Sequence, residues 1–184
     1  MIDEHRKDGA EIANESPLSE TSDIAESAEA ASPNQAGGES LQVVVAAVDR
    51  EFYGLPINAV REILRVPKIT WIPWTPKFIV GILNVRGEML SVVDTRLFFR
   101  RESAAVTASS RIVVIESREF TAGLLVDAMA DIFDVPMTTL QPAADNDADA
   151  DVRKYITGYF HWRTRLVPLL DIKVVLQGCV VNQA

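Results

Sequence analysis

The feature that most constrains the fold is an internal duplication of the chain. An apolar run followed by Arg-Glu-Phe occurs twice, and the residues after it also match. The matched segments are 43–52 with 112–120 and 55–67 with 124–136, and the matched single residues are Phe78, Gly81, Arg86 and Asp94 with Tyr155, Gly158, Arg163 and Asp171. Two copies of a long unit indicate a duplicated domain and not a solenoid, which needs more repeats.

The two units cover about 41–99 and 111–176, and both show the same order of local signals. Each reads as a hairpin, a turn-like segment, a strand, a variable link, a long hairpin and a short terminal helix. Short strands separated by turn residues favour small barrels or sandwiches over a sheet of alternating strands and helices. The sequence therefore predicts a mainly β fold with two barrels of about five strands each, one barrel per unit.

The links inside the two units differ in composition. Residues 67–77 are rich in proline and tryptophan, whereas residues 142–154 are acidic and alanine-rich and are expected to form a flexible loop. Trp71 and Trp74 are expected to cover the seam between the barrels. The alternative is that they anchor an interface, as exposed aromatic residues often do.

The charge of the chain is concentrated at its start. Ten Asp/Glu and two Lys/Arg fall in residues 1–40, so this segment accounts for the whole net charge of −8. It has no aromatic residue and too little apolar surface to offset the entropy of ordering, so we expect a disordered acidic tail. A duplicated domain over 41–177 and a short C-terminal tail over 178–184 complete the expected organisation.

Composition excludes several classes of protein. The acidic start lacks the basic and apolar regions of a signal peptide, and no apolar run approaches the roughly 20 residues that cross a bilayer. The single cysteine, Cys179, fits a reducing compartment. Because residues 41–184 are electrically balanced, nucleic-acid binding has no electrostatic support. We expect a cytoplasmic protein.

A polar insert interrupts two apolar runs at Asn84-Val85-Arg86-Gly87. A two-residue type I′ turn would require positive φ at Arg86, so we expect a three-residue loop with a type I turn and Gly87 as the left-handed residue of a bulge. Such a loop projects Arg86 from a rigid hairpin tip, toward water or toward a partner. In the second copy Thr164 replaces the glycine, and the same left-handed geometry is not expected there.

Three acidic residues have both a structural and a functional interpretation. Asp94 and Asp171 each precede a helix-like segment, which favours helix capping over a catalytic carboxylate pair because the position recurs in both copies. Glu62 lies in an alternating stretch typical of a half-exposed strand. It is either a solvated residue or an acidic contact beside exposed Val60 and Leu64.

No catalytic or metal-binding pattern is present. His5 falls in the tail, and His161 is parallel to Asn84, where a turn role is favoured. One cysteine and one folded histidine cannot form a zinc site, and no nucleophile elbow or phosphate loop occurs. The stretch 145–147 weakly suggests calcium but lacks the glycine and terminal glutamate of an EF-hand. We therefore predict no enzyme activity and no cofactor; the rival is a hydrolase using Asp94, Asp171 and His161.

Several motifs, in order and at appropriate spacing, resemble the CheW domain of bacterial chemotaxis coupling proteins. The resemblance covers about 41–177, and its most specific run is Phe-x-x-Gly-x-x-Asn-x-Arg-Gly, starting at Phe78. The motifs are Glu51–Leu55, Val60–Ile63, Pro76–Gly87, Val92–Asp94, Gly123–Asp127 and Tyr155–Gly158.

The resemblance implies two SH3-like five-stranded β-barrels with short helices, and a non-enzymatic scaffold. In that family the domain bridges the cytoplasmic tip of a methyl-accepting chemoreceptor and the regulatory domain of the CheA histidine kinase, so the protein meets the membrane only through receptors. The arginine and glutamate implicated in coupling fall on Arg86 and Glu62. The predicted partner-binding residues are Val60, Glu62, Ile63, Asn84, Arg86 and Gly87.

Three features depart from the family pattern: the long acidic tail, the tryptophan-rich first link and the acidic second link. They leave open a scaffold of the same fold in a pilus-linked, motility or pole-localised signalling complex. For the coupling role, the hypothesis is that a receptor helical tip docks in an apolar groove between the barrels while the kinase binds a separate face.

Overall fold

The computed structural model describes residues 39–143 and 150–179. The expected acidic tail lies outside these ranges except for its last two residues, as do the proposed calcium stretch 145–147 and residues 180–184. Disorder of the tail therefore stays a prediction. The C-terminal boundary lies later than expected, because the last helix continues to a buried Cys179.

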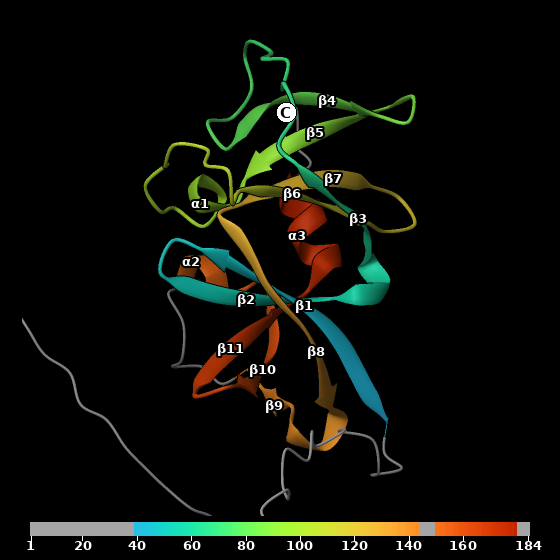
Figure 1. The fold of residues 1–184 in the computed structure, drawn as a ribbon, viewed down its shortest axis with the longest axis vertical. Helices are drawn as coiled ribbons and strands as arrows, with labels where there is room; N and C mark the ends of the chain where they lie inside the picture. The colour runs from blue at the N-terminus through green and yellow to red at the C-terminus, as the bar shows by residue number, and fades with distance from the viewer. Residues whose placement is uncertain (1–38, 144–149, 180–184) are drawn as a thin grey trace, which may run out of the picture. The chain divides into compact units, whose positions relative to one another are not determined.

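The described residues form eleven strands, three short α-helices and two 3₁₀ turns (Figure 1). The strands are β1 Ser40–Val48, β2 Glu51–Pro56, β3 Val60–Arg65, β4 Ile79–Val85, β5 Glu88–Asp94, β6 Arg111–Glu116, β7 Thr121–Val126, β8 Ala128–Pro136, β9 Gln141–Pro142, β10 Ile156–Trp162 and β11 Arg165–Leu170. The helices are α1 Thr95–Phe98, α2 Ala150–Arg153 and α3 Ile172–Cys179, and the 3₁₀ turns are η1 Ile57–Ala59 and η2 Met137–Thr139. The mainly β prediction is confirmed, whereas α2, with a buried Val152, corrects the expectation of a loop throughout 142–154.

The strands form two sheets, but the sheets do not follow the repeats. One sheet has the order β8-β1-β2-β11-β10-β9 and the other β3-β6-β7-β5-β4. The six-stranded sheet therefore takes its β1–β2 hairpin from the first repeat and its other strands from the second. The five-stranded sheet takes its β6–β7 hairpin from the second repeat and its other strands from the first. The expectation that each unit, 41–99 or 111–176, closes its own barrel is wrong. The alternation of a strand specifies which face it buries but not which neighbour it pairs with.

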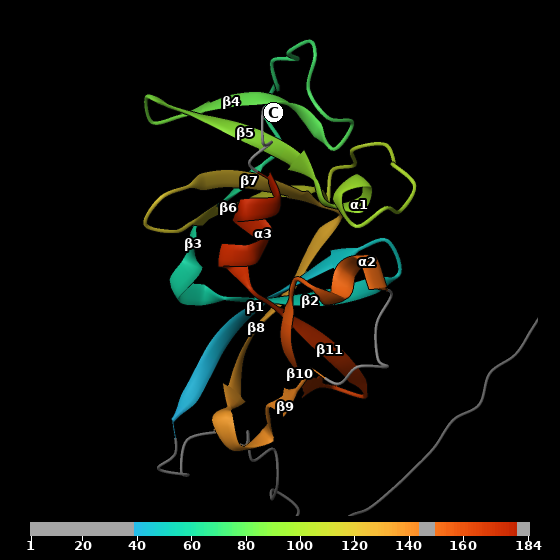
Figure 2. The same cartoon turned by 180° about the vertical axis from the view of Figure 1, so that it is seen from behind.

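The exchange is symmetric. When β1 to β5 are matched with β6, β7, β8, β10 and β11, the order of the five-stranded sheet becomes that of the six-stranded sheet without its edge strand β9. Both sheets also contain one parallel pair, β5 with β7 and β11 with β2. The chain passes between the sheets after β2, through η1, and again between β7 and β8, at Asp127 (Figure 2).

An arginine fixes the second of these crossings. The Arg96 guanidinium donates to both carboxylate oxygens of Asp127, with Nε–Oδ1 and Nη2–Oδ2 distances of 2.8 and 2.7 Å, and to Asp49 Oδ1 at 3.1 Å. The hydrogen bond to Asp127 is the main reason that the pKa of Arg96 is raised. Since Asp49 belongs to the β1–β2 turn, the three residues connect the exchanged hairpin to the strand crossing.

Local details confirm the equivalence of the two copies. The ladder shifts register beside Gly81 and beside Gly158. A Cβ at Gly158 would lie 2.5 Å from the Gln141 carbonyl oxygen, and a Cβ at Gly81 would overlap the Thr70 carbonyl oxygen, so both positions require glycine. The amide nitrogens of Asp94 and Asp171 donate to the matched Phe78 and Tyr155 carbonyls, both at 2.7 Å.

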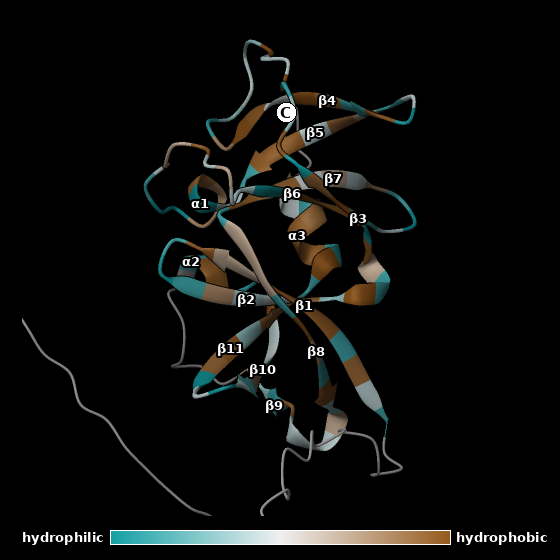
Figure 3. Ribbon diagram, in the orientation of Figure 1, coloured by the Kyte–Doolittle hydropathy of each residue, from teal (hydrophilic) through white to brown (hydrophobic). Residues whose placement is uncertain are grey.

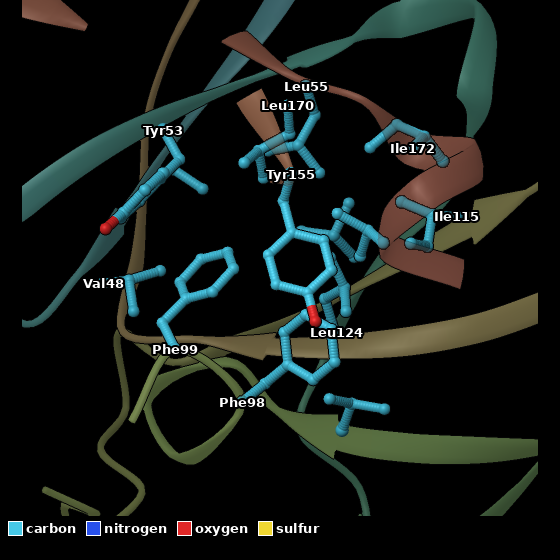
Figure 4. Close-up of a cluster of buried hydrophobic side chains, with 14 of the residues drawn as sticks. Val48, Tyr53, Leu55, Phe98, Phe99, Ile115, Leu124, Tyr155, Leu170 and Ile172 are labelled. Atoms are coloured by element: carbon cyan, nitrogen blue, oxygen red, sulfur yellow. The ribbon is translucent and has the colours of Figure 1, made fainter. Parts of the chain in front are cut away.

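The largest buried cluster joins the two sheets. Figure 4 shows four aromatic rings, those of Tyr53, Phe98, Phe99 and Tyr155, meeting among aliphatic side chains from both repeats. The rings of Phe98 and Tyr155 lie 4.8 Å apart. The helix α3 is mostly apolar along its length (Figure 3) and buries Ile172, Val175 and Leu176 in this cluster. Each such side chain contributes about 1.5–3 kcal/mol on burial, so the core holds the exchanged hairpins in place.

Candidate partner-binding site

The hairpin β4–β5 brings two of the predicted residues into contact. Arg86, at its tip, donates from Nη2 to Glu62 Oε2 of β3 at 3.2 Å. The exposure of the two side chains differs greatly, 81% for Arg86 and 17% for Glu62. The carboxylate is shielded beneath the guanidinium, so the group that this pair presents to a partner is the cation.

The turn that carries Arg86 differs from the predicted one. Val85 pairs directly with Glu88, so the loop has two residues, and the φ angles of Arg86 and Gly87 are 52° and 91°. This is a type I′ turn, and the predicted three-residue loop is wrong. The twist of a type I′ turn matches that of the flanking strands, and Asn84 Oδ1 accepts a hydrogen bond from the Gly87 amide at 2.9 Å. These gains offset the cost, about 1–2 kcal/mol, of a left-handed arginine.

A second arginine connects the site to further carboxylates. Arg61 Nη1 donates to Glu88 Oε2 at 2.6 Å and to Glu116 Oε2 at 3.3 Å, and Arg61 Nε lies 3.9 Å from Glu62 Oε1. The hydrogen bond to Glu88 is the largest cause of the raised pKa of Arg61. Sequence reasoning missed Arg61, Glu88 and Glu116 as members of the site. The three residues lie on β3, β5 and β6, and β5 is hydrogen-bonded to neither of the other two strands, so no local sequence pattern predicts their contact.

The apolar part of the site is also different from the prediction. Val60 and Leu64 are half-buried and pack against the core, so the expectation that they are exposed is wrong. Ile63, on the opposite side of β3, is 38% exposed, and Met89, which sequence reasoning missed, is 56% exposed beside the tip. Asn84 and Gly87 support the turn, Gly87 with nothing near the position of a Cβ.

The arrangement at the tip recurs in the second repeat. Trp162 pairs with Arg165, so Arg163 and Thr164 form a two-residue loop in which Arg163 has a φ of 56°. Arg163 Nη2 lies 3.8 Å from Asp131 Oδ2, the residue matched with Glu62. The left-handed geometry is therefore absent at Thr164, as expected, but present at the arginine, which was not expected.

A cleft of about 850 Å³ lies between the two sheets. Its walls come from η1, the β6–β7 turn, β10, the end of β11 and the start of α3, so both sheets contribute. Glu116 lines it and also binds Arg61, which connects the cleft to the hairpin site. The lining also includes Arg118, Glu119 and Lys173, which shows that this groove between the sheets is mixed in polarity and not apolar as predicted.

The two tryptophans of the first link are solvent-facing. Trp71 is 70% exposed and Trp74 100% exposed, so the prediction that they cover the seam is wrong. The backbone of this loop is held by the paired Thr70 and Ile82. Because ordered, exposed indoles are favoured at interfaces, the alternative role as an interface anchor stays a prediction.

The candidate catalytic residues have structural partners. Asp94 accepts hydrogen bonds from the amides of Arg96 and Leu97 and from the Ser103 hydroxyl, and Asp171 caps α3 in the same way. The capping prediction is confirmed. Within 39–143 and 150–179, no cluster of His, Cys, Asp or Glu could hold a metal ion. No helix in this part of the chain is both long and apolar enough to span a bilayer.

Comparisons with known proteins agree with this architecture. The model of the CheW-like domain family matches residues 42–179. The chemotaxis protein CheW of Klebsiella aerogenes is 26% identical over 150 residues, covering 80% of this chain and 90% of that protein. The scaffolding protein TtCheW of Thermoanaerobacter tengcongensis superposes with a TM-score of 0.70 at 27% identity, covering 79% of this chain and 97% of the other. Protein PilI of Pseudomonas aeruginosa is 29% identical over 110 residues, covering 60% of this chain and 61% of PilI.

Proposed function

The chain belongs to the CheW-like domain family, and from this premise we propose that it is a non-enzymatic scaffold that couples chemoreceptors to a histidine kinase of the CheA type. The observation that carries the proposal is the exposed Arg86 guanidinium, held above a shielded Glu62 on a stiff turn. A fixed cation beside exposed Met89 suits a protein surface that offers a carboxylate next to an apolar side chain.

The receptor tip is assigned to the hairpin and the adjoining cleft. An amphipathic helical tip that enters the cleft can place an apolar side chain against the exposed Phe120 and its charges against the polar lining. Arg86 does not line the cleft, so it contacts a part of the receptor that lies outside the cleft and fixes its orientation from there. The kinase regulatory domain binds a different face, so that one molecule can hold both partners.

A charge reversal tests the role of Arg86. The variant Arg86→Glu should bind a purified receptor tip at least about tenfold more weakly and fail to couple it to the kinase, because one charge-assisted contact is replaced by repulsion. Arg163→Glu, at the equivalent tip of the second repeat, is the matched control and should bind the receptor as the wild type does. Undiminished binding and coupling by Arg86→Glu would reject the assignment.

Exchanging the charges of Arg86 and Glu62 distinguishes a contact with a partner from an ion pair that only stabilises the hairpin. The double variant Arg86→Glu/Glu62→Arg keeps an ion pair between the tip and β3. If the pair only holds the hairpin to β3, the swap restores coupling. We expect it to restore thermal stability but not receptor binding, since the exposed charge now has the wrong sign.

The resemblance to PilI supports a second candidate, in which the same scaffold serves a pilus-linked signalling system. The fold and the hairpin site would be unchanged, and only the identity of the receptor would differ. Deletion of the gene distinguishes the two: loss of directed swimming supports a flagellar output, and loss of surface motility with normal swimming supports the pilus-linked one.

A further inference from the structure

A second cavity, of about 580 Å³, opens on the six-stranded sheet. It is bounded by the start of β2, by α2, by β10 and β11, and by Arg101 after α1. Neither Arg86 nor Glu62 lines it, so it is separate from the hairpin site. Its volume falls within the range of pockets that bind small molecules.

The lining of this cavity is rich in positive charge. Three arginines, Arg50, Arg101 and Arg165, and one acidic residue, Glu51, line it. Glu51 is already engaged, since it accepts hydrogen bonds from Tyr53 Oη at 2.6 Å and from Arg101 Nη2 at 3.2 Å. Among the residues that the structure describes, the Arg50 and Arg165 side chains have no carboxylate within ion-pair distance. The cavity therefore has at least two cations to offer to a ligand.

Aromatic packing holds one of these cations in place. The Arg165 guanidinium lies 5.1 Å from the centre of the Phe52 ring, and Phe52 in turn packs on Trp162 at 5.0 Å. A guanidinium lying over a ring keeps its N–H groups free at its edge, where they can bind two oxygens of one oxyanion. The entropy of fixing the long side chain is thus largely lost before any ligand arrives.

Comparison of the repeats shows that this cation is a departure from the first copy. Glu88 occupies the matched position on β5, paired across its tip with Val85 as Arg165 is with Trp162. The Glu88 carboxylate binds Arg61, whereas Arg61 is matched by Ala130 in the second repeat. In the second repeat an arginine therefore stands where the first has a glutamate, and an alanine stands where the first has the arginine that binds this glutamate.

We propose that this cavity binds the phosphate group of a small anionic molecule, a nucleotide being the class that fits best. The phosphate oxygens accept from Arg50 and Arg165, and Arg101, already bonded to Glu51, borders the same space. The flat base packs against the apolar part of the lining, where Leu166 is exposed and Pro168 is half-buried. Such a site gives the protein a small-molecule input that is separate from the hairpin site.

Calorimetric titration of the full chain with adenosine monophosphate tests the proposal. We expect saturable binding that weakens as salt rises. Arg50→Gln and Arg165→Gln should each weaken it about tenfold, as for the loss of one charge-assisted hydrogen bond. Arg65→Gln, which removes an exposed arginine on the other sheet, is the matched control and should have no effect. Adenosine, which lacks the phosphate, should not bind measurably.

A fluorescence titration adds an independent readout. In the Trp71→Phe/Trp74→Phe variant, Trp162 is the last of the three tryptophans and contacts Phe52 in the cavity wall, so its emission should change with the nucleotide. If inorganic phosphate bound as tightly as the nucleotide, the cavity would be an anion site and its assignment to a nucleotide would be wrong. Equal binding of adenosine, tighter binding of a glutamate-rich peptide, or no saturable binding would each overturn the proposal.

Discussion

Arg86 makes an ion pair inside the molecule, yet four-fifths of its side chain remains in water. An ion pair so exposed contributes at most about 1 kcal/mol to stability, and its left-handed backbone costs about as much. The residue is therefore poorly explained as a stabilising element. Its geometry is better explained as the placement of a charge where another protein can reach it.

Two buried ionisable side chains, Cys179 and Tyr53, make the stability of the fold depend on pH. Burial raises the pKa of the Cys179 thiol to about 12, and burial together with the hydrogen bond to Glu51 raises the pKa of Tyr53. Both groups are neutral in the folded protein and lose a proton more readily when unfolded. The stability that they contribute is therefore fully present below their unfolded pKa values, about 8.5 and 10, and is lost as pH rises toward the folded ones.

The prediction is a free energy of unfolding that falls above about pH 8.5, by up to about 1.4 kcal/mol per pH unit for each group. Urea unfolding curves between pH 7 and 11 measure it. In Cys179→Ala the fall should begin only near pH 10, where Tyr53 of the unfolded chain starts to titrate. An unchanged onset in that variant, or rapid reaction of the native thiol with a disulfide reagent at pH 8, would contradict the burial argument.

At the scale of the element, the β4–β5 turn holds a residue that suits it poorly. A type I′ turn favours asparagine and glycine at its centre, because both tolerate positive φ. The chain has Arg86-Gly87 there instead. This departure from local propensity supports the proposed role of Arg86, since functional sites are where such local preferences are overridden.

Arg86→Asn should therefore stabilise the fold while removing the proposed contact. We expect a gain of about 0.5–1 kcal/mol in unfolding free energy from relief of the left-handed strain, even after the ion pair to Glu62 is lost. Receptor binding should weaken as in Arg86→Glu, though less, since no repulsive charge is added. Thermal unfolding and a binding titration on the same preparation check both. A destabilised Arg86→Asn would show that the arginine is structural.

The elements also show what sequence can predict. Capping by Asp94 and Asp171 was predictable because it depends on residues two or three positions apart. The duplication was predictable because matched residues recur in the same order in both halves of the sequence. The turn at Arg86 was missed because the twist of a whole hairpin outweighed the preference of one residue. The network from Arg61 to Glu88 and Glu116 joins strands that are far apart in sequence, and no local pattern specifies their register.

At the scale of the whole molecule, the exchange of hairpins makes the two repeats interdependent. The β3–β6 and β1–β8 ladders join strands of different repeats over long registers, and Arg96 connects the β1–β2 turn to the β7–β8 crossing. Neither repeat alone contains a complete sheet. We therefore expect the two repeats to fold as one cooperative domain and not as two modules. A single domain holds the hairpin site and the cleft at a fixed separation.

This interdependence can be tested by cutting the exposed link between α1 and β6. A protease site placed over 104–107 should be cleaved in the folded chain, and the two pieces should stay together, because all the contacts between repeats remain. Each piece alone should give the circular dichroism of an unfolded chain, since its strands lack their neighbours. Mixing unfolded pieces should restore the native spectrum. If the piece over 39–104 folded alone into a stable sheet, each repeat would close its own barrel and the exchanged topology would be wrong.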